Sequence, residues 1–216
     1  MSLDELEQKL RLAQERMKQA HNSGDKEYWS AHSALLSVER EVAAAKGEPY
    51  AVPVDFPVQW DMGAPSPHVI TNDRRTLLAF LVGEVDPLWD GKYIKAKHPN
   101  AEYVQTLALV EFHGDVSTKL GSPNDEVFHG HPLEGRGREP YAAQIVMNSP
   151  WLAEIEAINK VHTHYNPERW RNDKHYIFWF HDSTFECIAK SFTVELYQES
   201  MYQMLMRMVD SLDDRY

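Results

Sequence analysis

The sequence HYIFWFHDSTFECIA, residues 175–189, predicts a central hairpin around which the rest of the chain can be placed. Two runs of high β-propensity, 176–181 and 184–189, flank Asp182-Ser183, which is the pattern of a β-hairpin. Because side chains alternate along a strand, one face of this hairpin is predicted to be core. That face carries Tyr176, Phe178, Phe180, Phe185, Cys187 and Ala189.

The opposite face mixes apolar and polar side chains, so we expect other residues to cover part of it. If Asp182-Ser183 forms the turn, His181 and Glu186 are diagonal neighbours on this face. An imidazole beside a carboxylate under apolar cover is suited to acid–base catalysis. We therefore take His181, Glu186 and Asp182 as candidate catalytic residues, and Trp179 as a candidate substrate contact. The alternative interpretation is that these side chains bond each other or the turn for structural reasons only.

A long loop predicted at 114–140 carries a second group of reactive side chains. Loops of this length inside a compact domain are usually functional or disordered, and interspersed apolar residues favour order here. The candidate catalytic residues of the loop are Asp125 and Glu126. Its candidate substrate-binding residues are Asn124 and Arg136.

Two histidines in this loop, His129 and His131, flank a glycine. In an extended backbone both imidazoles would point the same way, as two ligands of one divalent metal ion can. No third ligand follows from the sequence. The alternative interpretation is that both histidines brace the backbone or lie on the surface. A divalent metal cofactor is therefore one hypothesis, and metal-free chemistry is the other.

The composition is typical of a soluble globular protein, with 43% hydrophobic and 25% charged residues among 216. A net charge of −11 argues against binding to nucleic acid or to an anionic membrane. No apolar run approaches the roughly 18 residues of a membrane span, and the charged N-terminal segment lacks the apolar core of a signal peptide. We therefore expect a cytoplasmic protein. The single cysteine, Cys187, excludes an internal disulfide and a four-thiolate zinc site.

Three segments follow one another along the chain. Residues 1–46 contain two amphipathic runs separated by Asn22-Ser23-Gly24, which predicts an antiparallel helical hairpin. Residues 47–67 contain five prolines interleaved with apolar side chains, which predicts an extended connector packed on the core. Residues 68–216 form the main domain. Two helices alone bury too little surface to be stable, so we expect the hairpin to dock on its own domain or on a second copy in a homodimer.

The main domain is predicted to be rich in strands that follow one another without regular helices between them. The patterns outside the central hairpin lie at 68–70, 76–82, 104–113, 141–148 and 191–197. This order disfavours a doubly wound parallel sheet and predicts an α+β fold with a mainly antiparallel sheet of about six strands. Ser149-Pro150 predicts the start of a covering helix, and a methionine-rich stripe at about 199–212 predicts a C-terminal helix.

Three segments, PNDE at 123–126, HGHPL at 129–133 and HYIFWFHDSTFECIA, resemble an uncharacterised group of bacterial proteins that share them. The resemblance covers roughly residues 67–194 and implies no activity, ligand or fold. It implies that the shared polar residues belong to one recurrent design. These residues are Asn124, Asp125, Glu126, His129, His131, His181, Asp182 and Glu186.

Two functional hypotheses follow. The first is a small enzyme whose site joins the 121–133 loop to the hairpin and acts on a small polar substrate by hydrolysis or proton abstraction, with or without a metal. No serine or cysteine nucleophile motif predicts acyl-enzyme chemistry. The second is a noncatalytic binding protein that uses the helical hairpin and the acidic surface. Convergent His and carboxylate groups would favour the first hypothesis.

Overall fold

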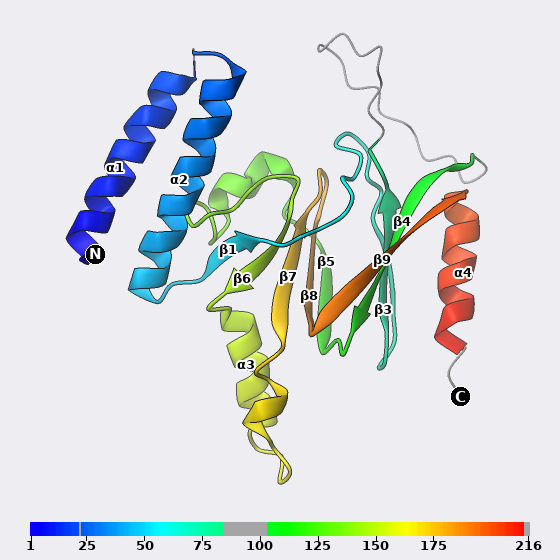
Figure 1. Cartoon of the computed structure of the whole chain (residues 1–216). Coiled ribbons are helices and arrows are strands. Elements are labelled where there is room, and N and C mark those ends of the chain that lie inside the picture. The colour runs from blue at the N-terminus through cyan, green and yellow to red at the C-terminus, as the bar shows by residue number, and fades with distance from the viewer. Residues whose placement is uncertain (22, 84–102, 214–216) are drawn as a thin grey trace.

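The computed structural model describes residues 1–21, 23–83 and 103–213. Within them the predicted α+β class is confirmed: an N-terminal helical pair, two antiparallel sheets and a C-terminal helix (Figure 1). The irregular segment predicted from Gly83 to Asn100 lies outside the described residues, apart from Gly83 itself. No helix in the described part of the chain is long and apolar enough to cross a membrane.

The described strands form two sheets rather than the one that was predicted. The five-stranded sheet has the order β1 (Tyr50–Pro53), β6 (Ala143–Met147), β7 (Lys174–Trp179), β8 (Thr184–Ala189) and β5 (Ser117–Gly121). The four-stranded sheet has the order β2 (His68–Thr71), β3 (Thr76–Leu81), β4 (Gln105–His113) and β9 (Ser191–Glu199). The two strands that the sequence did not predict, β1 and β5, are the edges of the first sheet. They lie in the segments predicted as connector and loop.

The main core lies between the two sheets and is rich in aromatic rings. Phe178 from the first sheet and Phe112 from the second are both fully buried there. The proline-rich connector supplies Trp60, which is only 3% exposed and has its ring centroid 4.8 Å from that of Phe180. The connector therefore contributes side chains to the core as well as covering it.

The central hairpin forms as β7 and β8, but its register differs from the predicted one by two residues. Trp179 pairs with Thr184 and Ile177 pairs with Glu186, whereas the prediction placed Ile177 opposite Ile188. The amide of Phe180 donates to the carbonyl of Ser183 at 3.0 Å, so the two turn residues are His181-Asp182 and not the predicted Asp182-Ser183. Because strands alternate with period two, the shift keeps every side chain on its predicted face and changes only its cross-strand neighbours.

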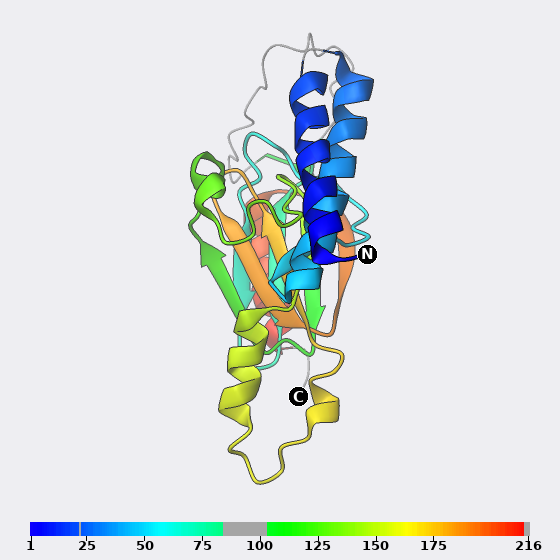
Figure 2. The same ribbon diagram turned by 90° about the vertical axis from the view of Figure 1, so that its left-hand side faces the viewer.

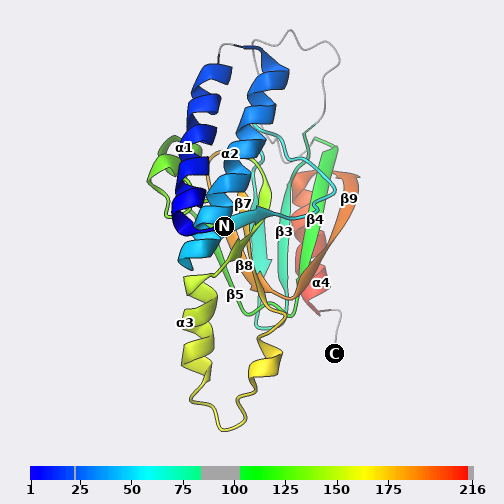
Figure 3. The same cartoon turned by 60° about the vertical axis from the view of Figure 1, so that its left-hand side comes forward.

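The helical hairpin consists of α1 (Leu3–Ala20) and α2 (Asp25–Lys46), which pack on each other through Leu6, Val38 and Val42. It joins the main domain through the C-terminal half of α2, as Figure 3 shows. Arg40 donates to the carbonyls of Ala51 and Gly137, at 2.8 Å and 3.1 Å. The hairpin thus docks on its own domain through one end, and the homodimer stays a prediction.

Two further helices flank the sheets. Helix α3 (Pro150–Asn159) starts at the predicted Ser149-Pro150 and follows β6 directly. Helix α4 (Met201–Asp213) buries Met204 and Met208 against Leu77 and Leu107 on the outer face of the four-stranded sheet. Two short 3-10 helices, η1 (Asp125–Gly130) and η2 (Pro167–Arg169), lie in the connecting segments.

Candidate functional site

The outer face of the five-stranded sheet, turned away from the other sheet, is covered by the segment that follows β5. Phe128 and Leu133 from this segment are buried against Ile177 and Trp179. The apolar residues that predicted an ordered loop are therefore the ones that fix it to the sheet. Figure 2 shows the segment (green) beside the helical hairpin (blue).

Two hydrogen bonds join the start of this segment to the hairpin turn. The amide of Asp125 donates to the carbonyl of His181 at 2.9 Å, and the hydroxyl of Thr184 donates to the carbonyl of Pro123 at 3.0 Å. The carboxylate of Asp125 is thereby placed beside the imidazole of His181.

Four side chains meet at this point, and we call them the turn cluster: Asp125, Tyr141, His181 and Asp182. The Nδ1 atom of His181 lies 3.5 Å from Oδ1 of Asp125 and 3.2 Å from Oδ1 of Asp182. The hydroxyl of Tyr141 donates to Oδ2 of Asp125 at 2.5 Å. Both carboxylates therefore face the same edge of the imidazole ring, and Tyr141 supports one of them from behind.

The turn cluster contains two buried polar atoms that lack an ordinary hydrogen bond. Nδ1 of His181 and Oδ1 of Asp125 are both buried, and neither has a partner within hydrogen-bonding geometry among the described residues. Native proteins leave few such atoms, and those that occur usually have a functional reason or a missing partner. The side chain of His181 is nevertheless 38% exposed, so the part of the ring away from Nδ1 is open to solvent.

Tyr141 is held in an unusual backbone conformation. Its φ of 56° lies in the left-handed region, which a bulky residue seldom adopts and which costs about 1–3 kcal/mol. Burial and the hydrogen bond to Asp125 raise the pKa of Tyr141 to about 12. The phenol is therefore protonated at neutral pH and acts as a donor to Asp125.

A second group on the same outer face, the sheet cluster, consists of Lys119, Ser149, His175 and Glu186. Oγ of Ser149 lies 2.8 Å from Nδ1 of His175, and Nε2 of His175 lies 2.8 Å from Oε2 of Glu186. Lys119 lies across the strand pair from Glu186, with Nζ 3.8 Å from Oε1, and it also stacks 3.6 Å over the ring of Trp151.

None of the buried side-chain polar atoms that lack a hydrogen bond among the described residues belongs to the sheet cluster. Because Oγ of Ser149 accepts from the amide of Leu152, its own hydrogen is free to be donated to His175, whose Nε2–H then donates to Glu186. Ser149 and His175 are 8% and 5% exposed. Burial raises the pKa of Glu186, but the hydrogen bond from His175, together with the positive charge of Lys119, outweighs it and leaves the pKa lowered. This cluster therefore braces the sheet around an ionised carboxylate.

The predicted catalytic residues are thus divided between the two clusters. His181, Asp125 and Asp182 meet in the turn cluster, whereas Glu186 pairs with His175 instead of His181. The two-residue change in register explains this difference, since it makes His175 the diagonal neighbour of Glu186. Glu126 is exposed at the first turn of η1.

The predicted substrate contacts lie elsewhere. Trp179 is fully buried, and its indole N–H donates to Gln144 at 2.9 Å, so its place is in the core beneath the loop. Arg136 forms an ion pair with Glu48 at 3.3 Å. Asn124 precedes η1 beside Asp125, without a side-chain capping bond.

The two histidines predicted as metal ligands do not lie on an extended backbone, because residues 125–130 form η1. His129 is exposed. His131 is half-buried against Trp179, its Nδ1 accepts from the amide of Leu133 at 3.1 Å, and burial lowers its pKa. In the described ranges, no group of three or more His, Cys, Asp or Glu side chains is arranged to hold a metal ion.

Sequence reasoning missed Tyr141, Ser149, His175 and Lys119 as members of these clusters. The face of the hairpin that carries His175 was predicted correctly, but the predicted register did not place His175 beside Glu186. Tyr141 and Ser149 belong to segments far from the hairpin, and no local pattern indicates that they reach it. Against known proteins, no family model, no curated protein and no solved structure matches the chain.

Proposed function

We propose that the protein is an enzyme that uses His181 as a general base on a small polar substrate. The observation that carries the proposal is the meeting of Nδ1 of His181 with Oδ1 of Asp125, two buried atoms without ordinary hydrogen bonds, on a ring that is 38% exposed. Carboxylates at Nδ1 favour a hydrogen there, which leaves the lone pair on Nε2. That nitrogen is the one that can accept a proton from outside.

The chemistry that fits this arrangement is activation of a water molecule or of an acidic substrate proton. Nε2 of His181 takes the proton, and Asp125 and Asp182 stabilise the imidazolium that results. Tyr141 keeps Asp125 oriented throughout, as its protonated hydroxyl remains a donor. The imidazolium then returns the proton to a leaving group. Catalytic hydrogen bonds are often long in an unliganded enzyme and shorten when substrate binds, which accounts for the 3.5 Å separation.

The charge of the cluster limits the substrate class. Asp125 and Asp182 lie within 3.5 Å of the ring, and exposed Glu126 follows directly. Three carboxylates disfavour an anionic substrate. We therefore expect an uncharged polar substrate with a hydrolysable bond or an acidic proton.

The experiment is hydrolysis of a panel of uncharged 4-nitrophenyl esters by the wild type and by His181→Gln, Asp125→Asn and the matched control His164→Gln. His164 is exposed and belongs to neither cluster. General-base catalysis contributes roughly 100- to 10,000-fold, so His181→Gln should lose at least about 100-fold in kcat. Asp125→Asn should lose less, and His164→Gln should match the wild type. Equal rates for His181→Gln and His164→Gln would contradict the proposal.

A further inference from the structure

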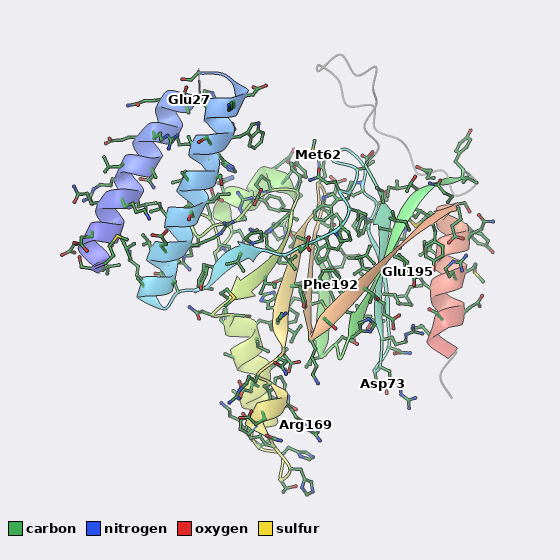
Figure 4. All side chains as sticks on the ribbon, in the orientation of Figure 1. Glu27, Met62, Asp73, Arg169, Phe192 and Glu195 are labelled. Atoms are coloured by element: carbon green, nitrogen blue, oxygen red, sulfur yellow. The ribbon has the colours of Figure 1, made fainter. Side chains whose placement is uncertain are left out.

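A groove of about 670 Å³ lies on the other side of the molecule, between α4 and β9 on the outer face of the four-stranded sheet. None of its lining residues belongs to the turn cluster or the sheet cluster. Its volume is within the range of small-molecule sites, about 300–1,000 Å³. Glu195, one of the lining residues, is labelled on β9 near α4 in Figure 4.

The groove has an apolar floor, and its walls contain two tyrosine rings and a methionine side chain. Leu77 and Leu109 form the floor, on strands β3 and β4. Tyr197 of β9 lines one wall, and Tyr202 and Met206 of α4 line the other. Tyr202 is 60% exposed and Met206 45%, which are large exposed areas for such side chains. The groove therefore offers an aliphatic or aromatic surface to a ligand.

The charges of the groove are predominantly negative. Four carboxylates line it, from Glu111, Glu195, Glu199 and Asp210, against two guanidinium groups, from Arg75 and Arg207. Arg75 forms an ion pair with Glu111, in which Nη2 lies 2.9 Å from Oε1. Arg207 pairs with Glu199 at 2.9 Å and stacks 4.4 Å over the ring of Tyr197. The groove thus already holds one cation by a carboxylate and an aromatic face.

Two of the carboxylates form no ion pair in the described part of the chain, although the charge of Glu195 also interacts with that of Arg207. Glu195 accepts a hydrogen bond from the hydroxyl of Tyr197, and neither Glu195 nor Asp210 forms an ion pair with any described residue. They stand on opposite walls, one on β9 and one on α4. A ligand with two positive ends and an apolar middle matches this distribution of charge.

We propose that the groove binds an aliphatic diamine or polyamine. The ammonium groups pair with Glu195 and Asp210, and the methylene chain lies on Leu109, Met206 and the tyrosine rings. Burial of the methylene groups stabilises the bound chain, and an ammonium over a tyrosine face adds a cation–π contribution. The net charge of −11 attracts such cations to the protein in general, so any test must separate the groove from the rest of the surface.

The experiment is isothermal titration of the full chain with 1,5-diaminopentane and spermidine, with 1,5-pentanediol as the uncharged probe. The groove variant is Glu195→Gln with Asp210→Asn. The matched control, Glu15→Gln with Glu27→Gln, removes the same charge from the exposed surface of the helical hairpin, where Figure 4 labels Glu27. Urea unfolding midpoints establish that both variants are folded.

We expect one diamine per chain for the wild type and the control, at least a tenfold weaker affinity for the groove variant, and no binding of the diol. Failure of the wild type to bind either amine at millimolar concentration would overturn the proposal. Equal affinities for the two double variants would also overturn it, because binding would then be a general effect of surface charge. Diol binding as tight as diamine binding would refute the role of the carboxylates.

Discussion

At the scale of single residues, the environment of each carboxylate separates the two clusters. Glu186 has a hydrogen bond from His175 and the charge of Lys119, and every partner is in place. Asp125 has a donor on one oxygen only, and its other oxygen faces the unsatisfied Nδ1 of His181. A saturated group favours structural bracing, whereas an unsaturated one leaves interactions to be completed by a substrate. This contrast is why we assign chemistry to the turn cluster.

The lowered pKa of Glu186 predicts how stability depends on pH. A carboxyl whose pKa is lower in the folded chain stabilises the fold above its unfolded pKa of about 4.5, and this contribution disappears as the pH falls through the folded value. Glu186→Gln should therefore be less stable than the wild type by about 1–2 kcal/mol at pH 7. The difference should narrow below pH 4.5. Urea unfolding at pH 7 and at pH 4 measures the difference in unfolding free energy between the wild type and the variant, with exposed Glu126→Gln as the control. The same difference at both pH values would disprove the assignment.

At the scale of elements, the strands of the hairpin and core patterns could be predicted from the sequence, but the edge strands, the register and the sheet membership could not. The alternation in β7 and β8 fixed which side chains face the core, because it depends only on local period. The turn decided the register, and Asp182-Ser183 is a weaker turn signal than Asn-Gly, so the turn at His181-Asp182, closed by Phe180 and Ser183, was missed. The edge strands β1 and β5 were missed because proline-rich and polar sequences form strands only beside a partner.

The junction between α2 and the loop over the site leaves no room for a larger side chain at Gly137. Gly137 has a φ of 79°, and a Cβ there would lie 2.4 Å from Cγ of Arg40. Gly137→Ala should cost about 2–4 kcal/mol through strain and steric overlap. Gly135→Ala is the matched control, because its φ is 69° with nothing within 4 Å, and it should cost only about 1 kcal/mol. Urea unfolding compares the two, and equal losses would show that the contact with Arg40 is not limiting.

At the scale of the whole molecule, the two sheets enclose one aromatic core, and each outer face carries a different feature. The turn cluster lies on the five-stranded side, and the groove between α4 and β9 lies on the four-stranded side. Neither could be assembled from the sequence alone. Asp125, Tyr141 and His181 come from three separate segments, and only the tertiary fold brings them together. The groove joins β9 to α4, whose relative placement no periodicity encodes.

The reactivity of the Cys187 thiol tests whether the core between the two sheets stays closed to solvent. Cys187 is fully buried between the sheets, and burial raises the pKa of its thiol to about 12. Only the thiolate reacts readily with disulfide reagents. We predict that 5,5′-dithiobis(2-nitrobenzoate) labels no thiol in the native protein at pH 8 and one thiol per chain in 8 M urea. Rapid labelling without denaturant would show that the sheets separate on that timescale.

The central claim is that the carboxylate of Asp125 holds the hydrogen of His181 on Nδ1 and leaves Nε2 as the base. The most direct test is the ¹⁵N chemical shift of both ring nitrogens of His181, in protein labelled with [¹⁵N]histidine and at a pH where the ring is neutral. We predict the Nδ1–H tautomer in the wild type, a loss of that preference in Asp125→Asn, and a smaller change in Asp182→Asn, since Asp182 is 80% exposed. An Nε2–H tautomer in the wild type, or a tautomer that ignores Asp125→Asn, would contradict the account.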